Sequence, residues 1–117
     1  MNPAPIKPEI TFEEFQRVDI RVGTIREISD VAGSKKLLRL VVDFGDRTRT
    51  ILSGMKGERP DPREIVGLQT LFVVNLAPRK MAGVTSEGML LDIGYADGIP
   101  PALPLPERRV PEGARAG

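Results

Sequence analysis

The sequence predicts an all-β domain with short helices, organised as a five-stranded barrel with a C-terminal extension. Apolar and polar residues alternate in stretches of strand length, and helix signals occur only before the first strand and between the third and fourth. At 117 residues the chain has the length of one domain with one core. We expect a flexible leader at residues 1–10, a barrel at 11–95 and a Pro-rich extension at 96–117 that packs on the barrel or on a dimer interface.

The N-terminal part contains the signals for one short helix and one long strand. Three prolines in the first nine residues predict an extended leader. Thr11 and Glu14 then have the spacing of a capping box, so a short helix is expected there. Residues 18–28 follow as a long strand that begins with strict alternation. Gly23 lies in its middle and indicates a bend or a bulge, as tightly curled barrels require.

The second and third strands, residues 37–44 and 47–53, are predicted to form a hairpin joined by a Gly45-Asp46 turn. Arg39 lies on the polar face of the second strand. Arg47 and Arg49 share a face of the third strand, and we expect them to lie near Arg39 across the pair. Four apolar residues share the other face of the second strand: Leu38, Leu40, Val42 and Phe44.

The remaining elements complete a recognisable order. An Asp cap, a Pro in the first turn and a final Gly mark residues 61–67 as a short helix, and residues 68–76 and 88–93 have the pattern of strands. From Tyr95 onward, an Asp97-Gly98 turn signal and five prolines within residues 100–111 disfavour any regular element. Five strands with a helix between the third and fourth is the order of an OB-fold. That barrel binds oligonucleotides on its strand 2–3 face and through the loops joining strands 1–2 and 4–5.

Positive charge is concentrated in one part of the chain, although the net charge is only +1. Residues 31–59 carry seven basic and three acidic side chains, whereas residues 1–30 carry four basic and six acidic ones. Lys35 and Lys36 lie between strands 1 and 2, and Arg79 and Lys80 between strands 4 and 5. The positive features therefore fall where an OB-fold binds. Charge alone does not distinguish this surface from an ordinary solvated strand face.

The absence of cysteine and histidine excludes several functional classes. A disulfide framework, a Cys-ligated zinc site and an iron–sulfur cluster are excluded, and the commonest general base is missing. We therefore predict no catalytic residues, no metal and no cofactor, and a binding protein rather than an enzyme. No apolar run approaches the roughly 20 residues that span a bilayer, and no signal-peptide core is present. A cytoplasmic protein without a membrane partner is expected.

Residues 75–91 are the most specific stretch of the chain. One apolar strand leads into Pro-Arg-Lys-Met, and a second leaves through Thr-Ser-Glu-Gly-Met. Two cations, two methionines, an amide and two hydroxyls are thus held on one loop, which suits a phosphate-bearing surface. Cations contact phosphates, whereas amides and hydroxyls reach a ribose 2′-hydroxyl or a base edge. Met81 and Met89 fit a core position and a contact surface equally well.

Five motifs occur in order along residues 10–95. They are Asp-Ile-Arg-Val-Gly at 19–23, Ser-Lys-Lys-Leu-Leu-Arg-Leu at 34–40, Ile-Leu-Ser-Gly at 51–54, Asn-Leu-Ala-Pro-Arg-Lys-Met at 75–81 and Thr-Ser-Glu-Gly-Met-Leu-Leu at 85–91. In these motifs the chain resembles the structure-specific tRNA-binding domain family. That family occurs as free-standing dimeric proteins, as the C-terminal extension of bacterial methionyl-tRNA synthetase and in the CsaA chaperones. The free-standing branch fits best.

The resemblance implies a homodimeric OB barrel that binds tRNA without catalysis, grips the outer corner of the tRNA L by its shape, and aids an aminoacyl-tRNA synthetase. Seven contact residues follow from the motifs, and Arg49 is added on charge alone. The expected tRNA-binding residues are Lys36, Arg39, Arg49, Asn75, Arg79, Lys80, Ser86 and Met89. Apolar residues of the Pro-rich tail, Leu103, Leu105 and Val110, are the candidate dimer interface.

Two alternatives bear on the function. A single-stranded RNA is disfavoured as the ligand, because the chain has four Phe, one Tyr and no Trp, and all four Phe lie in apolar or helical patterns. Few aromatic rings then remain for base stacking. The alternative function is a CsaA-like dimeric chaperone that binds peptides in an apolar groove at its dimer interface.

Overall fold

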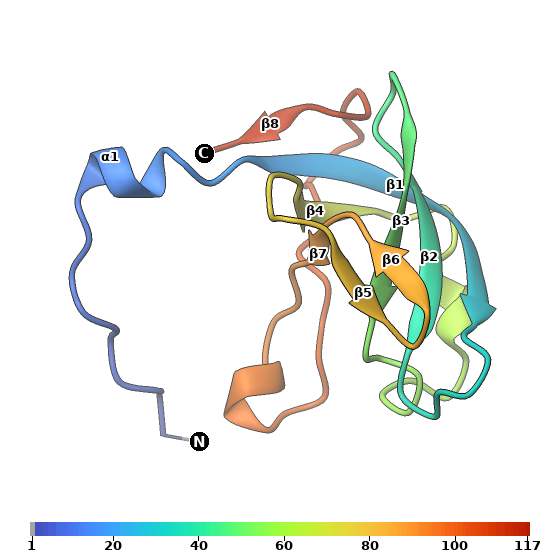
Figure 1. Cartoon of the computed structure of the whole chain (residues 1–117). Coiled ribbons are helices and arrows are strands. Elements are labelled where there is room, and N and C mark those ends of the chain that lie inside the picture. Colours follow the sequence, from blue (N-terminus) through green and yellow to red (C-terminus); the bar gives the residue numbers. More distant parts are fainter. Residues whose placement is uncertain (1) are drawn as a thin grey trace.

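The structure is a computed structural model that describes residues 2–117. The main sheet has the strand order β3-β2-β1-β4-β7, with β8 also paired to β1, and β5 and β6 form a separate two-stranded sheet (Figure 1). The predicted all-β, five-stranded OB-like fold is confirmed. No helix in the described range is both long and apolar enough to cross a membrane. The elements are α1 (Phe12–Phe15), β1 (Ile20–Asp30), β2 (Leu38–Asp43), β3 (Thr48–Ser53), the 3₁₀ helix η1 (Pro62–Ile65), β4 (Gln69–Val73), β5 (Arg79–Met81), β6 (Val84–Ser86), β7 (Met89–Leu90), the 3₁₀ helix η2 (Tyr95–Asp97) and β8 (Arg115–Ala116).

β1 is the central strand, and it curls so that its first half pairs with β4 and its second half with β2. Of the bend or bulge predicted at Gly23, the bulge is not there, because the register shift lies further along, between Ile25 and Glu27. A lack of space for a side chain explains why residue 23 is glycine. A Cβ at Gly23 would lie 2.5 Å from Val42 Cγ1 and 2.8 Å from the Phe44 ring, so the barrel wall has no room for a side chain there.

The predicted hairpin of β2 and β3 is present, with Gly45 at a positive φ of 94° in the turn. Its register corrects one expectation. Arg39 pairs with Leu52, whereas Arg49 pairs with Val42. Because directly opposed residues point to the same face, Arg39 and Arg49 lie on opposite faces of the hairpin. The expected proximity of Arg39 and Arg49 is therefore wrong.

The barrel closes where β3 meets residues 86–88. The Glu87 backbone N–H donates to the Thr50 carbonyl at 2.8 Å, and the Thr50 N–H donates back to the Glu87 carboxylate at 3.1 Å. Gly88 fits here because a Cβ would lie 2.9 Å from the Val73 carbonyl oxygen. The fifth strand, β7, is shorter than predicted, because only two of its residues keep ladder pairing with β4.

The core lies inside the curled sheet. The four apolar residues predicted to share one face of β2 are all buried. Phe44 and Phe72 meet edge to face with ring centroids 5.5 Å apart, an arrangement favoured by the quadrupoles of the two rings. The two other phenylalanines lie on α1, as the helical pattern predicted, and their side chains are 70% (Phe12) and 44% (Phe15) exposed.

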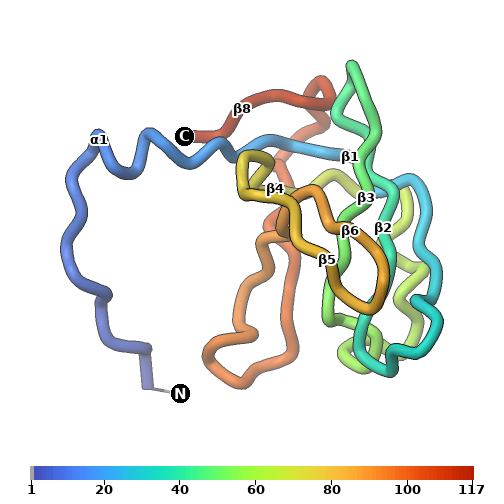
Figure 2. The backbone as a smooth tube through the Cα atoms, in the orientation of Figure 1, coloured from blue at the N-terminus to red at the C-terminus, as the bar shows by residue number. Residues whose placement is uncertain are grey.

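The C-terminal segment runs back along the barrel (Figure 2). The Gln69 side chain donates to the Val110 carbonyl at 2.7 Å and accepts from the Val110 N–H at 3.0 Å. The Thr70 hydroxyl donates to the Pro104 carbonyl at 3.0 Å. The expectation that the chain from Tyr95 onward lacks regular structure is wrong in two places, the short 3₁₀ helix η2 and the strand β8. β8 lies beyond the last proline, so its backbone N–H groups are free to pair with β1.

Two segments project from the barrel: the N-terminal residues through α1, and the loop at 94–101 that carries η2 (Figures 1 and 2). The predicted capping box of α1 is confirmed, with the Thr11 hydroxyl accepting from the Glu14 N–H at 3.1 Å and the Glu14 carboxylate accepting from the Thr11 N–H. None of the α1 residues is buried.

Candidate nucleic-acid interface

The predicted basic loop between the fourth and fifth strands is itself a β-hairpin, made of β5 and β6. Its two turn residues, Ala82 and Gly83, have φ values of 50° and 79°. Positive φ at both positions is what a two-residue type I′ turn requires. Because side chains alternate along a strand, Arg79 and Lys80 project from opposite faces of this ribbon. Both side chains are exposed.

Five cations on this hairpin, on β2 and in the loop before β2 lack a carboxylate partner. Within residues 2–117 no Asp or Glu oxygen lies within 4.0 Å of their side-chain nitrogens. Eight other Lys and Arg side chains form ion pairs, and the four remaining ones without a carboxylate partner in this range are Lys7, Arg17, Arg49 and Arg63. All five are exposed, so their charge is available to an external anion. The five are Lys35, Lys36, Arg39, Arg79 and Lys80.

A run of contacts connects Arg39 to the hairpin. Arg39 pairs with Leu52 across β2 and β3, the Leu52 N–H donates to Ser86, and Ser86 pairs with Arg79 across β6 and β5. The two arginines thus lie on the outer two of four neighbouring strands, a span of three strand spacings or about 14 Å. The structure brings Arg39 and Arg79 onto one side of the barrel.

Ser86 was predicted to contact RNA, and its position requires a correction. The side chain is buried, with 4% exposed. Its hydroxyl accepts from the Leu52 N–H at 3.0 Å and donates to the Gly88 carbonyl at 3.1 Å. The hydroxyl therefore has its partners within the protein, where it fastens the hairpin to β3.

Asn75 is exposed, and its amide has partners within the protein. Its amide oxygen accepts from the Asp19 N–H at 2.8 Å, and its amide nitrogen donates to the Arg17 carbonyl at 2.6 Å. Both ends of the amide thus hold the chain segment that enters β1. This segment is separated by 56 residues from Asn75 in sequence, so the motif alone could not reveal the contact.

Met89 and Met81 have different surroundings. Met89 is 44% exposed on β7, as a contact surface requires. Met81 is half-buried on β5, and the most buried methionine is Met55, with 4% exposed. Met89 therefore has the exposure of a surface residue, whereas half-buried Met81 still fits either a core or a contact position.

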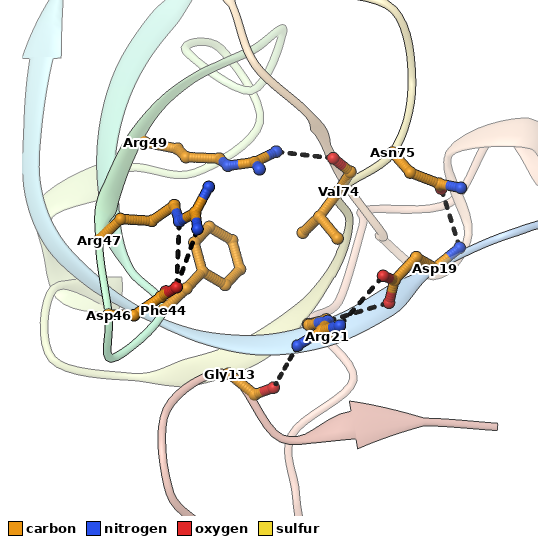
Figure 3. Close-up of a pocket in the computed structure, with 9 residues that line it drawn as sticks. All are labelled: Asp19, Arg21, Phe44, Asp46, Arg47, Arg49, Val74, Asn75 and Gly113. Carbon is orange, nitrogen blue, oxygen red and sulfur yellow. Dashed lines mark hydrogen bonds and ion pairs between the residues drawn. The ribbon is translucent and has the colours of Figure 1, made fainter.

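Arg49 lies apart from the exposed cations, at the end of the barrel where β1 begins. Its Nη1 donates to the Val74 carbonyl at 2.6 Å and to the Glu87 carbonyl at 3.2 Å. It lines a pocket of about 270 Å³ together with Arg21 and Arg47 (Figure 3). Sequence analysis missed Arg21 as a functional candidate, although the alternation in β1 places it on the same face as Asp19.

Two ion pairs shape the electrostatics of this pocket. Arg21 makes a two-point contact with the Asp19 carboxylate at 3.0 and 3.2 Å, and this hydrogen bonding holds the pKa of Asp19 below its usual range. Arg47 pairs with Asp46 at 3.0 Å and lowers the pKa of that carboxyl in the same way. Both carboxyls are therefore ionised at neutral pH.

A family model described as "Putative tRNA binding domain" matches residues 20–115 of the chain. Methionine–tRNA ligase from Bacteroides fragilis is 44% identical over 110 residues, which cover 94% of this chain and 16% of that protein. The chain thus spans about one sixth of the length of the curated relatives it matches.

Solved structures with the same fold include a MetRS related protein from Pyrococcus horikoshii, at 37% identity and a TM-score of 0.86, with 95% of this chain and all of that chain covered. The chaperone CsaA from Bacillus anthracis is 27% identical, with a TM-score of 0.78 and coverage of 94% and 100%. The CsaA chaperone protein from Picrophilus torridus is also 27% identical, with a TM-score of 0.81 and coverage of 93% and 100%.

Proposed function

Because this chain belongs to the tRNA-binding domain family, as its five motifs indicated, we propose that it binds folded tRNA through the β5–β6 hairpin and the adjoining outer face of β2. The role is binding and not catalysis. The observation that carries the proposal is the set of five exposed cations without carboxylate partners in the described part of the chain: two lie on the hairpin, one on β2 and two in the loop that leads into β2. Lys36, Arg39, Arg79 and Lys80 supply phosphate contacts, and Met89 adds an apolar contact.

The geometry of the hairpin supports recognition of a folded RNA. Arg79 and Lys80 point away from each other, so a ligand that satisfies both cations needs phosphates on both sides of the ribbon. Two backbone segments that meet in a folded RNA provide this, whereas one extended strand passes along one side. The barrel phenylalanines, Phe44 and Phe72, are buried and offer no stacking surface to a single strand.

A competition experiment tests the proposal. Total tRNA is bound in a mobility-shift assay at two salt concentrations, with a duplex RNA and an unstructured single strand as competitors. Retention of tRNA against both competitors is expected. Contacts to three to five phosphates give a slope of log affinity against log salt of about −2 to −3.5, and a steeper one for duplex-like contacts. Equal displacement by either competitor would leave only a general basic surface.

Charge variants test the site itself. Arg79→Ala combined with Lys80→Ala is expected to weaken tRNA binding strongly and to leave thermal stability unchanged, because both side chains are exposed and unpaired. Arg63→Ala combined with Arg108→Ala removes the same charge from exposed positions elsewhere and serves as the matched control. Equal loss of affinity in both double variants would mean that net charge, and not the hairpin, determines binding.

We also propose that the protein is a homodimer, and that α1 forms part of the interface. Of the tail residues predicted for the interface, Leu103 packs against the core, Gln69 holds the backbone of Val110, and Leu105 is exposed. In contrast, Phe12 and Phe15 are exposed on a one-turn helix that gains no packing from its own barrel. Short helices are stabilised mainly by packing of an apolar face, and a second copy offers the same face for a two-fold contact.

Sedimentation equilibrium of the whole chain tests the interface. The unmodified chain is expected to behave as a dimer, and Phe12→Ser with Phe15→Ser as a monomer with an unchanged barrel. Leu105→Ser, at an exposed tail position, is the comparison. A dimer that survives the α1 variant and dissociates in the tail variant would move the interface to the tail.

The second candidate function is peptide binding of the CsaA type. The same exposed apolar side chains on α1 support it, together with the similarity to two CsaA chaperones. Suppression of the aggregation of a denatured client protein is the assay, and no suppression at equimolar protein removes this candidate.

The similarity to methionine–tRNA ligases supports a role in providing tRNA affinity to a synthetase. A lower KM for tRNA of a synthetase on addition of the domain would be the expected result.

A further inference from the structure

The pocket at the end of the barrel has the composition of an anion site. Three arginines reach it from two strands, Arg21 from β1 and Arg47 and Arg49 from β3 and the turn before it, around an apolar floor that includes Phe44 and Val74 (Figure 3). Its volume of about 270 Å³ is below the roughly 300–1,000 Å³ of clefts that enclose a whole small-molecule ligand. The pocket therefore suits one group of a larger ligand.

The charges in the pocket do not cancel. Asp19 pairs with Arg21, and Asp46 pairs with Arg47. Arg49 has no carboxylate within 4.0 Å in the part of the chain that the structure describes, so the three arginines and two aspartates leave one positive charge. A half-buried, uncompensated guanidinium attracts an anion more strongly than an exposed one, since solvent screens it less.

The Arg49 side chain is also fixed by two hydrogen bonds, and it keeps further N–H donors that are not used within the described part of the protein. A guanidinium has five N–H donors, and the two on Nη1 are used by the Val74 and Glu87 carbonyls. The Nε and Nη2 donors have no acceptor within residues 2–117. These form the edge of the guanidinium that binds phosphate or carboxylate at two points. Fixing the side chain in advance reduces the entropy lost on binding.

We propose that this pocket is a phosphate subsite, in which Arg49, supported by Arg47 and Arg21, binds one phosphate group of the bound RNA. The inference rests on the proposed function and extends it beyond the hairpin. Asn75 lines the pocket and lies four residues before Arg79, so the two sites are at most about 14 Å apart along the chain. An RNA backbone that contacts the hairpin can thus continue into the pocket.

Titration with inorganic phosphate at constant ionic strength, followed by backbone amide NMR, tests the subsite without RNA. Shifts are expected around the β2–β3 turn, Val74 and Gly113. Arg49→Gln is expected to weaken phosphate binding about tenfold, as loss of one charged hydrogen bond does. Asp46→Asn is expected to strengthen it, and Arg63→Gln is the matched control. Equal affinity in all four proteins, or an equal response to acetate, would overturn the assignment.

Asp46→Asn keeps the test decisive if Arg49→Gln does not fold, because Asp46 is exposed and pairs only with its neighbour Arg47. A merely structural pocket would not bind phosphate more tightly when a carboxylate is removed. Unchanged phosphate affinity in Asp46→Asn would therefore count against the proposal by itself.

A second set of measurements identifies the source of the phosphate. The affinity of Arg49→Gln for tRNA is compared with that of the unmodified protein, using tRNA with and without its 5′-phosphate. Weaker binding for both tRNAs supports a phosphodiester of the backbone as the occupant. Weaker binding only for the 5′-phosphorylated tRNA supports the terminal phosphate. Unchanged binding would overturn the RNA assignment. Failure of the proposed function is separate, because the unmodified protein would then bind inorganic phosphate but not tRNA.

Discussion

Replacing Ser86 by alanine distinguishes a residue that fastens the hairpin from one that contacts RNA. The Ser86 hydroxyl is the partner of the Leu52 N–H and the Gly88 carbonyl, and both interactions lie in a buried or partly buried setting. Each polar group left without a partner in such a setting costs about 1–3 kcal/mol. Partial hydration of the less buried Gly88 carbonyl lowers the sum, so we expect a loss of about 2–3 kcal/mol in the free energy of unfolding.

The assay combines stability and binding on the same protein. For a chain of this length the expected loss lowers Tm by about 10 °C. The tRNA affinity of the folded variant is expected to match that of the unmodified protein at a temperature well below its Tm. Thr85→Ala removes a hydroxyl from the adjacent exposed position and is expected to change stability by less than about 0.5 kcal/mol. An unchanged Tm together with weaker tRNA binding in Ser86→Ala would refute the reasoning and restore Ser86 as a contact.

Three further predictions concern stability. A Cβ at Gly23 would lie 2.5 Å from Val42, so Gly23→Ala should lower the free energy of unfolding, measured by urea titration, by about 1–3 kcal/mol. Gly54→Ala is the control, because a Cβ at Gly54 meets no atom within 4 Å in the described chain. Equal losses in the two variants would contradict the packing argument. Ala82 has a φ of 50°, a conformation that glycine adopts more easily than alanine. Ala82→Gly should therefore raise the free energy of unfolding by up to about 1 kcal/mol, and a lower free energy of unfolding would argue against strain in the turn. The hydrogen bond from Arg21 lowers the pKa of Asp19 in the folded chain. The ionised Asp19 carboxylate therefore stabilises the fold fully above the unfolded pKa of about 3.9, and this stabilisation is lost as the pH falls through the lower folded pKa. The stability difference between the unmodified chain and Asp19→Asn should therefore shrink at acid pH, and a constant difference would exclude the ion pair as its cause.

The five strands of the barrel could be predicted from the sequence, whereas the β5–β6 hairpin and β8 were not expected as strands. Alternation in β2 identified the four buried apolar residues, and the Gly45-Asp46 turn was located in the right place. A two-residue turn also determines which residues pair across the hairpin. With Gly45 and Asp46 as the turn, the residue numbers of each pair add up to 91. That relation already places Arg49 opposite Val42 on the apolar face and Arg39 opposite Leu52. Arg39 and Arg49 share their charge but lie on opposite faces, so charge alone does not predict which arginines are neighbours.

The site shows a different limit of sequence analysis, because a motif does not separate residues that hold a loop from residues that project from it. Asn75 and Ser86 stand in the same motifs as Arg79, Lys80 and Met89, and all have side chains suited to RNA. The distinction depends on partners distant in sequence, 56 residues away for Asn75 and 34 for Ser86. Those contacts make the hairpin a rigid support, and rigidity is what allows exposed cations to meet a folded ligand at fixed positions with little loss of entropy. A variant of a fastening residue is thus expected to act on stability, and a variant of a projecting cation on affinity and its salt dependence.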